Sequence, residues 1–204
     1  MSFIRRLPKT ELHLHLDGSL PFEFIRARAN ARGIDLPAGT SSGGDDGEQA
    51  LRNYLHGMKA RARRQDKLNA QPVGGNWGVF DWCNRFLMTK EELSDAASMI
   101  CEHAATKHNV LRTELRFCPA LHTQESLTAR DAINAVVEGV QRASVGTNGV
   151  IVCALRSHDA KHSMEMAQLA VDANRETDGI VCGFDIAGDE GSFPLSIHKV
   201  SIPS

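Results

Sequence analysis

The chain has 204 residues, 42% of them hydrophobic and 24% charged, with a formal net charge of −2, which is ordinary for one globular domain with a substantial core. This charge balance gives no electrostatic reason to expect a nucleic acid or an anionic membrane as a partner. No apolar run has the length of a membrane span or signal peptide, and the five cysteines are scattered, so we expect a cytoplasmic protein with reduced thiols.

The first predicted element is a strand over residues 11–16, in which leucines alternate with His13 and His15. A strand has a side-chain period of two, so both imidazoles are expected on one face and the leucines on the other. Asp17 and Gly18 follow directly, where the strand opens into a loop. Such a pair is commonly two solvated side chains, but two imidazoles converging from one strand end are also half of a metal site. Both readings stay open for the pair alone.

A helix is predicted over residues 21–32. Turn-forming residues then dominate positions 38–48, and the basic stretch 49–67 is typical of a solvated helix face. We predict that residues 38–78 form a flexible insertion within a single domain, 1–204.

An aromatic cluster follows the insertion and consists of Phe80, Trp82 and Phe86. Trp82 and Phe86 are four residues apart and would share one face of a helix. The cluster fits a hydrophobic core and a lid over a ligand equally well.

Strands and helices alternate through the rest of the chain. Helices are predicted over 90–107, 126–143 and 158–177, and strands over 110–117, 150–155 and 180–186. Thr89 and Glu92 have the spacing of a capping box at the first of these helices. The apolar run 150–155 is typical of a parallel strand buried on both faces. The order of elements predicts an α/β fold with a parallel sheet of about four βα units.

Two stretches of the sequence resemble the adenosine deaminase family, within the metal-dependent amidohydrolases. Residues 8–20 read Pro-Lys-Thr-Glu-Leu-His-Leu-His-Leu-Asp-Gly-Ser-Leu, and residues 183–190 read Gly-Phe-Asp-Ile-Ala-Gly-Asp-Glu. Residues 113–119 and 154–156 give supporting matches. The resemblance implies a TIM-type (β/α) barrel and the zinc-dependent hydrolysis of adenosine to inosine and ammonia.

The same resemblance implies roles for four residues. His13 and His15 match zinc ligands on the first strand, and His15 also contacts the substrate. Asp17 matches the acid that hydrogen-bonds the ribose, and Gly188 matches the glycine whose backbone N–H meets a purine ring nitrogen. An aspartate at position 17 favours a purine nucleoside, because related deaminases of free adenine resemble this motif with glutamate there.

The chain departs from the family's pattern at the remaining ligands. It has no His-Ala-Gly-Glu motif, which carries the third histidine and the proton-handling glutamate, and no Ser-Asp-Asp-Pro, which carries the aspartate ligand. His198 has no glutamate beside it, so we do not expect it to replace the third ligand. A complete barrel needs eight strands and about 250 residues. We therefore expect an incomplete barrel, an incomplete zinc site and no deaminase activity from these 204 residues alone.

Two alternatives remain open: a non-catalytic half-barrel that acts as an interaction module, and a deaminase of another purine, of the adenine or AMP type. An open four-stranded sheet would leave two unpaired edges and an apolar inner face, which predicts self-association. Arg116 and Arg156 lie at predicted strand ends, where structural ion pairs explain them as well as a binding role does.

Overall fold

The computed structural model describes residues 3–69, 77–123 and 126–199, and of residues 61–69 and 77 only the backbone is described. One parallel sheet has the strand order β1-β2-β3-β4. Its strands are β1 (Lys9–His15), β2 (Val110–Phe117), β3 (Gly149–Leu155) and β4 (Val181–Ala187). The predicted parallel α/β fold of about four βα units is confirmed.

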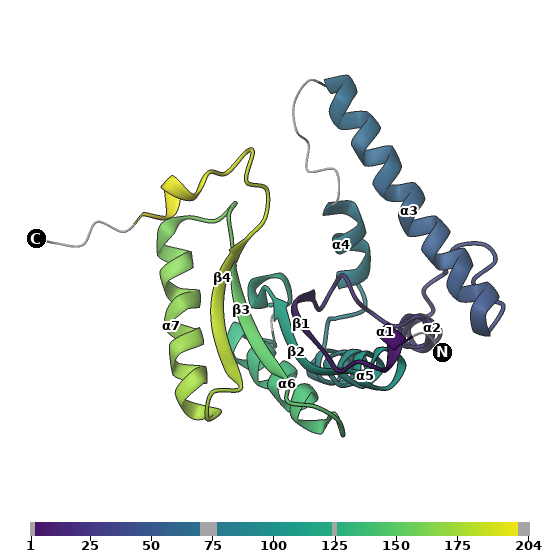
Figure 1. The fold of residues 1–204 in the computed structure, drawn as a ribbon. Helices are drawn as coiled ribbons and strands as arrows, with labels where there is room; N and C mark the ends of the chain where they lie inside the picture. The colour runs from purple at the N-terminus through teal and green to yellow at the C-terminus, as the bar shows by residue number, and fades with distance from the viewer. Residues whose placement is uncertain (1–2, 70–76, 124–125, 200–204) are drawn as a thin grey trace, which may run out of the picture.

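The helices pack around this sheet (Figure 1). They are α1 (Phe3–Arg6), α2 (Phe22–Arg32), α3 (Gly44–Asn69), α4 (Trp77–Asn84), α5 (Lys90–His108), α6 (Ala129–Arg142) and α7 (Ala160–Glu176), with 3-10 turns η1 (Pro119–Leu121) and η2 (Leu195–His198). Because all strands are parallel, their carboxyl ends meet at one edge of the sheet, and loops from separate βα units converge there.

Residues 38–78, predicted as a flexible insertion, include the long helix α3 and the first two residues of α4. The helix begins at Gly44, so the predicted loop over 38–48 ends at residue 43. Acidic Asp45 and Asp46 lie in the first turn of α3, where the helix dipole favours negative charge. The flexibility of the insertion stays a prediction, and residues 70–76 lie outside the described part of the chain.

Local signals in the sequence fix several helix ends. Thr89 caps α5 by accepting a hydrogen bond from the Glu92 N–H at 3.1 Å. In a capping box the Glu92 carboxylate would accept a hydrogen bond from the Thr89 N–H. It accepts instead from the N–H of the preceding residue, Met88, at 2.7 Å. A reciprocal capping box does form at α6, between Thr128 and Asp131.

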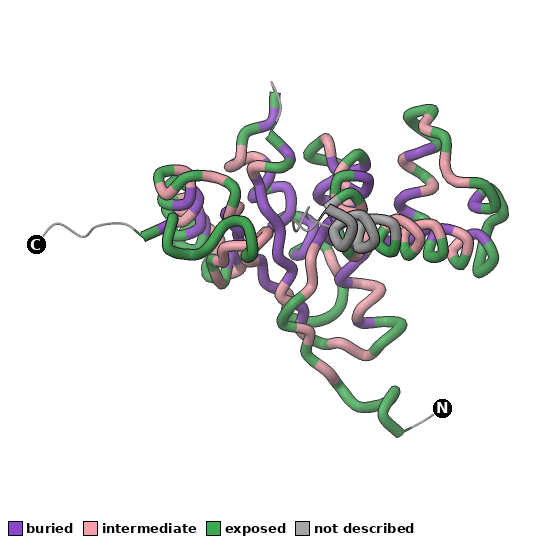
Figure 2. Tube along the Cα trace, turned by 90° about the horizontal axis from the view of Figure 1, so that it is seen from above, coloured by how far each residue is buried: buried purple, intermediate pink, exposed green. Residues whose placement is uncertain are grey.

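The core cluster contains buried residues of the sheet and of helices α2, α4, α5, α6 and α7 (Figure 2, buried residues in purple), and within it α5 packs against α6. These two helices approach closely at Gly139, where an added Cβ would lie 2.2 Å from the Ser94 carbonyl oxygen. Sheet residues Leu115, Val150 and Val152 are fully buried on this side. Burial of such side chains contributes roughly 1.5–3 kcal/mol each, which makes this layer the stable base beneath the strand ends.

The opposite face of the sheet differs from the apolar surface expected from the sequence. Alternation along β2 places Arg112, Glu114 and Arg116 on one face. Arg112 pairs with Glu114 at 2.7 Å, and Arg116 of β2 pairs with Asp185 of β4 at 2.5 Å across the intervening strand. The prediction of an apolar inner face fails for β2 but holds for β3, where Ile151 and Cys153 lie opposite Arg116 and Asp185 in the register. Charged residues on this face are paired with one another, and a side chain that bridges β2 and β4 indicates a sheet curved toward this face.

Candidate metal and substrate site at the strand ends

His13 and His15 lie together at the carboxyl end of β1. Their ring centroids are 5.4 Å apart and the ring planes are tilted by 45°. His13 is exposed and His15 is half-buried. The two imidazoles therefore face the same side, as the alternation predicts.

Strand β1 is irregular where it presents these rings. Glu11 pairs with Thr113 and Leu14 pairs with Leu115. Between these two pairs β1 advances by three positions and β2 by only two, so β1 carries one extra residue there. This is the geometry of a β-bulge, which redirects side chains at a strand end. Leu12 lies in the irregular stretch and is 53% exposed.

Charge and burial both act on the pKa of His15. Partial burial lowers it first, and the neighbouring His13 and Arg116 lower it further, while Asp185 opposes them. Each lowering effect disfavours the imidazolium form. A neutral imidazole is the form that binds a metal ion.

Asp17 follows His15 by two residues and is buried, 8% exposed. Burial raises its pKa to about 6, although hydrogen bonds from the Gly18 backbone and the Asn84 side chain lower it. Its Oδ1 has no hydrogen-bond partner among the described residues. Since a buried carboxylate oxygen is costly to leave unpaired, this atom is suited to receive a donor from a bound molecule.

The aromatic cluster of α4 divides between the two predicted roles. Trp82 and Phe86 are buried in the core, 8% and 0% exposed, with ring centroids 5.1 Å apart. Phe80 is half-buried and its ring centroid lies 6.0 Å from that of His15. Of the three aromatic residues, Phe80 is therefore the one whose ring lies against His15.

Gly188 directly follows β4, at the other edge of the sheet from β1. Its φ of +124° is a conformation that residues with a side chain rarely adopt. An added Cβ would lie 3.4 Å from both the backbone N and the Cβ of Arg156. The sequence places a glycine here because the backbone requires one.

His198 does not join this site. Its Nδ1 lies 2.8 Å from the Ser163 hydroxyl and its Nε2 lies 3.1 Å from the Arg156 carbonyl oxygen. Arg156 in turn donates to Glu190 at 3.2 Å. Both ring nitrogens are occupied, as expected for a structural histidine, and Arg156 and Arg116 both form ion pairs.

The histidine pair offers ligands of a type that suits a metal ion, but too few of them for a catalytic site. Two neutral imidazoles are good zinc ligands, but a catalytic zinc usually has three protein ligands. Among the side chains that the structure describes, in residues 3–60, 78–123 and 126–199, no group of three or more His, Cys, Asp and Glu could hold a metal ion. These residues alone do not provide a catalytic zinc centre.

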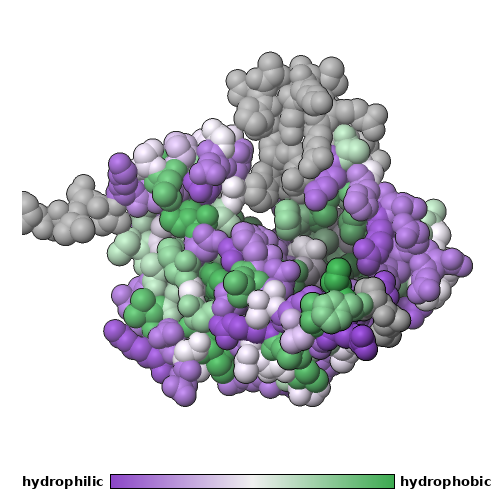
Figure 3. All heavy atoms as spheres, viewed as in Figure 1, coloured by the Kyte–Doolittle hydropathy of each residue, from purple (hydrophilic) through white to green (hydrophobic). Residues whose placement is uncertain are grey.

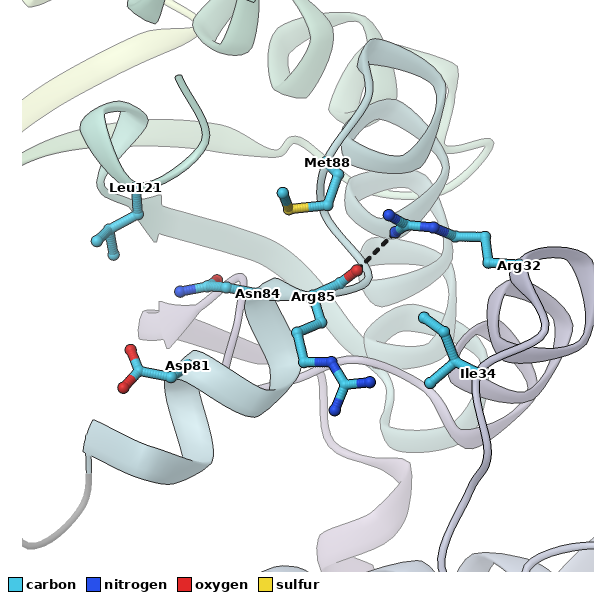
Figure 4. Close-up of a pocket in the computed structure, with 7 residues that line it drawn as sticks. All are labelled: Arg32, Ile34, Asp81, Asn84, Arg85, Met88 and Leu121. Carbon is cyan, nitrogen blue, oxygen red and sulfur yellow. Dashed lines mark hydrogen bonds between the residues drawn. The ribbon is translucent and has the colours of Figure 1, made fainter. Parts of the chain in front are cut away.

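A separate cavity of about 380 Å³ lies beside α4 (Figure 4). It is lined by Arg32, Ile34, Asp81, Asn84, Arg85, Met88 and Leu121. Within this lining, the Arg32 guanidinium donates a hydrogen bond to the Arg85 carbonyl oxygen at 2.6 Å. Neither histidine of β1 reaches it. Asn84 is the link between the two regions, because it also hydrogen-bonds Asp17.

The sequence analysis passed over Asn84 and Asp185. Asp185 lies within residues 183–190, so the resemblance could have marked it, but its partner Arg116 is 69 residues away. Asn84 has no signal in the sequence, because its contact with Asp17 depends on how α4 packs over the end of β1.

The curved parallel sheet, with helices on its outer side and paired histidines at the end of the first strand, defines half of a TIM-barrel amidohydrolase fold. A family model described as adenosine deaminase matches residues 8–201. The chain therefore belongs to the adenosine deaminase family.

Individual relatives support this assignment. The adenosine deaminase of Streptococcus agalactiae serotype III (strain NEM316) is 35% identical over 194 residues, which are 94% of this chain and 51% of that protein. The adenosine deaminase of Enterococcus faecalis (strain V583) is 34% identical over 197 residues, 95% of this chain and 52% of that protein. The chain spans about half the length of the curated relatives that it matches.

Solved structures with the same fold also match along half of their length. A zinc-bound amidohydrolase from Burkholderia ambifaria has a TM-score of 0.69 at 24% identity, covering 96% of this chain and 48% of that one. Arabidopsis ADAL in complex with IMP has a TM-score of 0.70 at 19% identity, covering 97% and 54%. No helix in the described part of the chain is long and apolar enough to cross a membrane.

Proposed function

We propose that this chain carries the first-strand part of an adenosine deaminase site, in which His13 and His15 are zinc ligands and Asp17 and Gly188 contact a purine nucleoside. The observation that carries the proposal is the paired imidazoles 5.4 Å apart, beside the buried Asp17 with its unpartnered Oδ1. When bound in such a site, zinc supplies an activated water for hydrolysis. The described residues hold two of its ligands, so the 204 residues alone do not release ammonia.

The chain's own residues have defined tasks in this proposal. Asp17 Oδ1 accepts a hydrogen bond from a ribose hydroxyl, and burial makes that bond stronger than it would be in water. His15 contacts the substrate as well as the metal. The backbone N–H of Gly188 donates to a ring nitrogen of the base. Phe80 lies against His15 and helps to exclude water from the pair.

Adenosine is the favoured substrate within the purines. The relatives named above as adenosine deaminases match nearly the whole of this chain, and Asp17 suits a ribose hydroxyl. Adenine and AMP are the competing substrates, since one solved structure of this fold is an adenine deaminase from Arthrobacter aurescens and another holds IMP. We place the reaction in the cytoplasm, in keeping with five cysteines that are all free.

We also propose self-association as an alternative role. Among the described strands, β1 and β4 each have one unpaired edge. Exposed apolar side chains accompany both edges, including Leu12 on β1 and Phe184 on β4. On the side of the molecule drawn in Figure 3, apolar residues lie in separate clusters between hydrophilic areas. Pairing of open strand edges, with these side chains at the seams, would join one copy to another.

One set of samples tests both roles. The 204-residue chain, and a fusion that continues it with the remaining half of the Streptococcus agalactiae deaminase, are incubated with Zn²⁺ and adenosine, adenine or AMP. We expect ammonia from the fusion with adenosine, none from the 204 residues, and loss of the fusion's activity on His13→Ala. Ammonia from the 204 residues, or a folded, zinc-loaded fusion without activity, contradicts the proposal. Light scattering of the 204-residue chain reports self-association, and a monodisperse monomer contradicts it.

A further inference from the structure

The peptide that joins Leu12 to His13 is held by side chains at both of its polar groups. Its carbonyl oxygen, on Leu12, accepts a hydrogen bond from Arg116 Nη2 at 2.9 Å. Its N–H, on His13, donates to Glu11 Oε1 at 2.9 Å. This peptide lies in the irregular stretch of β1, where the register with β2 is shifted. The side chains therefore replace ladder hydrogen bonds that the extra residue interrupts.

Arg116 is itself fixed in place. It lies opposite His15 in the β1–β2 register and is 8% exposed. Its Nη1 donates to Asp185 Oδ2 at 2.5 Å, so a single guanidinium contacts β1 and β4 from its position on β2. A planar guanidinium can hold two acceptors in set directions at once, which a lysine ammonium does less well.

We propose that Arg116, held by Asp185, is a positioning residue that sets the bulge of β1 and so the relative placement of the His13 and His15 rings. Without it, the Leu12 carbonyl loses a charge-assisted hydrogen bond, and β1, which has one free edge in the described sheet, relaxes toward a regular ladder. His13 lies within the shifted stretch, whereas His15 lies beyond it, opposite Arg116 in the register with β2. A relaxation of that stretch therefore moves the His13 ring relative to the His15 ring. The link from placement to metal binding rests on the proposed function.

Arg112 provides a matched control for this inference. It lies four residues earlier on the same face of β2 and pairs with Glu114 at 2.7 Å, but no hydrogen bond to β1 is seen among the described residues. Arg112→Met and Arg116→Met therefore remove equal charge and length from one strand. Only the second removes a contact with the Leu12 carbonyl.

The test is backbone hydrogen exchange, resolved by residue, on the full chain. We expect Arg116→Met to accelerate exchange at His13 and its neighbours tenfold or more while amides of the β2–β3 ladder keep their rates, and Arg112→Met to change neither. Arg116→Lys should resemble Arg116→Met, because one ammonium does not serve both acceptors as the fork does. Unchanged exchange at His13, or uniform acceleration over the sheet, overturns the proposal.

Asp185→Asn covers the case in which Arg116→Met does not fold. It retains a neutral acceptor for Arg116, and we expect a smaller acceleration confined to the same amides of β1; no local change in this variant overturns the proposal. A Zn²⁺ titration of the wild-type chain, read by calorimetry, separates the two hypotheses. Absence of zinc binding by the wild type contradicts the proposed function, whereas the exchange data decide the role of Arg116 independently.

Discussion

Four histidines of this chain form two pairs that differ in what their ring nitrogens contact. The His13 and His15 rings lie against each other at a strand end, and no hydrogen bond to either ring is seen among the described residues. His122 and His198 are buried, and each has a ring nitrogen within 3.1 Å of a backbone carbonyl oxygen. The first pair has nitrogens available to a ligand, whereas each ring of the second pair uses at least one nitrogen to hold the fold. The contrast predicts opposite responses in stability and in metal binding.

The largest expected effect on stability belongs to His122. Burial lowers its pKa to about 4, against an ordinary value of 6.5. Below pH 6.5 the unfolded chain takes up a proton that the folded chain refuses, so stability falls as the pH drops from 6.5 to 4 and is unaffected by this group above 6.5. The full effect is at most about 3.5 kcal/mol, since one pKa unit is worth about 1.4 kcal/mol.

Urea unfolding of the wild type and of His122→Gln, measured from pH 7.5 to 4.5, checks this prediction. The variant's amide can still donate to the Leu87 carbonyl, which the His122 ring meets at 3.0 Å. Carboxylates titrate in both proteins, so the difference between the two curves isolates the histidine. Parallel curves across this pH range would place the ring in a less buried setting.

His198→Ala should come next, with a loss of about 1–3 kcal/mol in the free energy of unfolding. The substitution leaves the Ser163 hydroxyl and the Arg156 carbonyl oxygen without the ring that now joins them. It also releases η2 from its contact with α7. His56→Ala is the control, because His56 is exposed on α3 and should change stability by less than about 0.5 kcal/mol. Equal stability of the two variants in urea unfolding would remove His198 from the structural pair.

Sequence alone predicted the regular part of this molecule well. The strand predicted over residues 110–117 matches β2, and Gly149–Leu155 extends the predicted 150–155 by one residue, because apolar patterning reports local burial. The pairing of the histidine rings followed from the same periodicity. These are properties of neighbouring residues, and neighbours in sequence are enough to determine them.

The parts that escaped prediction depend on contacts between distant segments. The bulge in β1 depends on its register with β2, and the charged inner face depends on Arg116 meeting Asp185, 69 residues away. The contact of Asn84 with Asp17 depends on the packing of α4. The loop predicted over 38–48 is shorter in the structure, because α3 already begins at Gly44. Acidic residues such as Asp45 and Asp46 are common in loops, but they also stabilise the first turn of a helix.

The smallest expected change in stability, and the sharpest test of the contrast, comes from the strand-end pair. His13→Ala removes an exposed ring and should cost less than about 0.5 kcal/mol in the absence of metal.

In the wild type, Zn²⁺ at ten times its dissociation constant should stabilise the chain by about 1.4 kcal/mol, because it binds the folded pair and not the dispersed histidines of the unfolded chain. The double variant His13→Ala/His15→Ala should lose this gain, while His198→Ala and His56→Ala retain it. Thermal unfolding with and without Zn²⁺ measures the wild type and the four variants, and a zinc-dependent shift that survives in the double variant would move the metal away from β1. The sign of the effect separates the pairs, because removing a ligand histidine abolishes a response to zinc, whereas removing a structural histidine lowers stability equally with and without it.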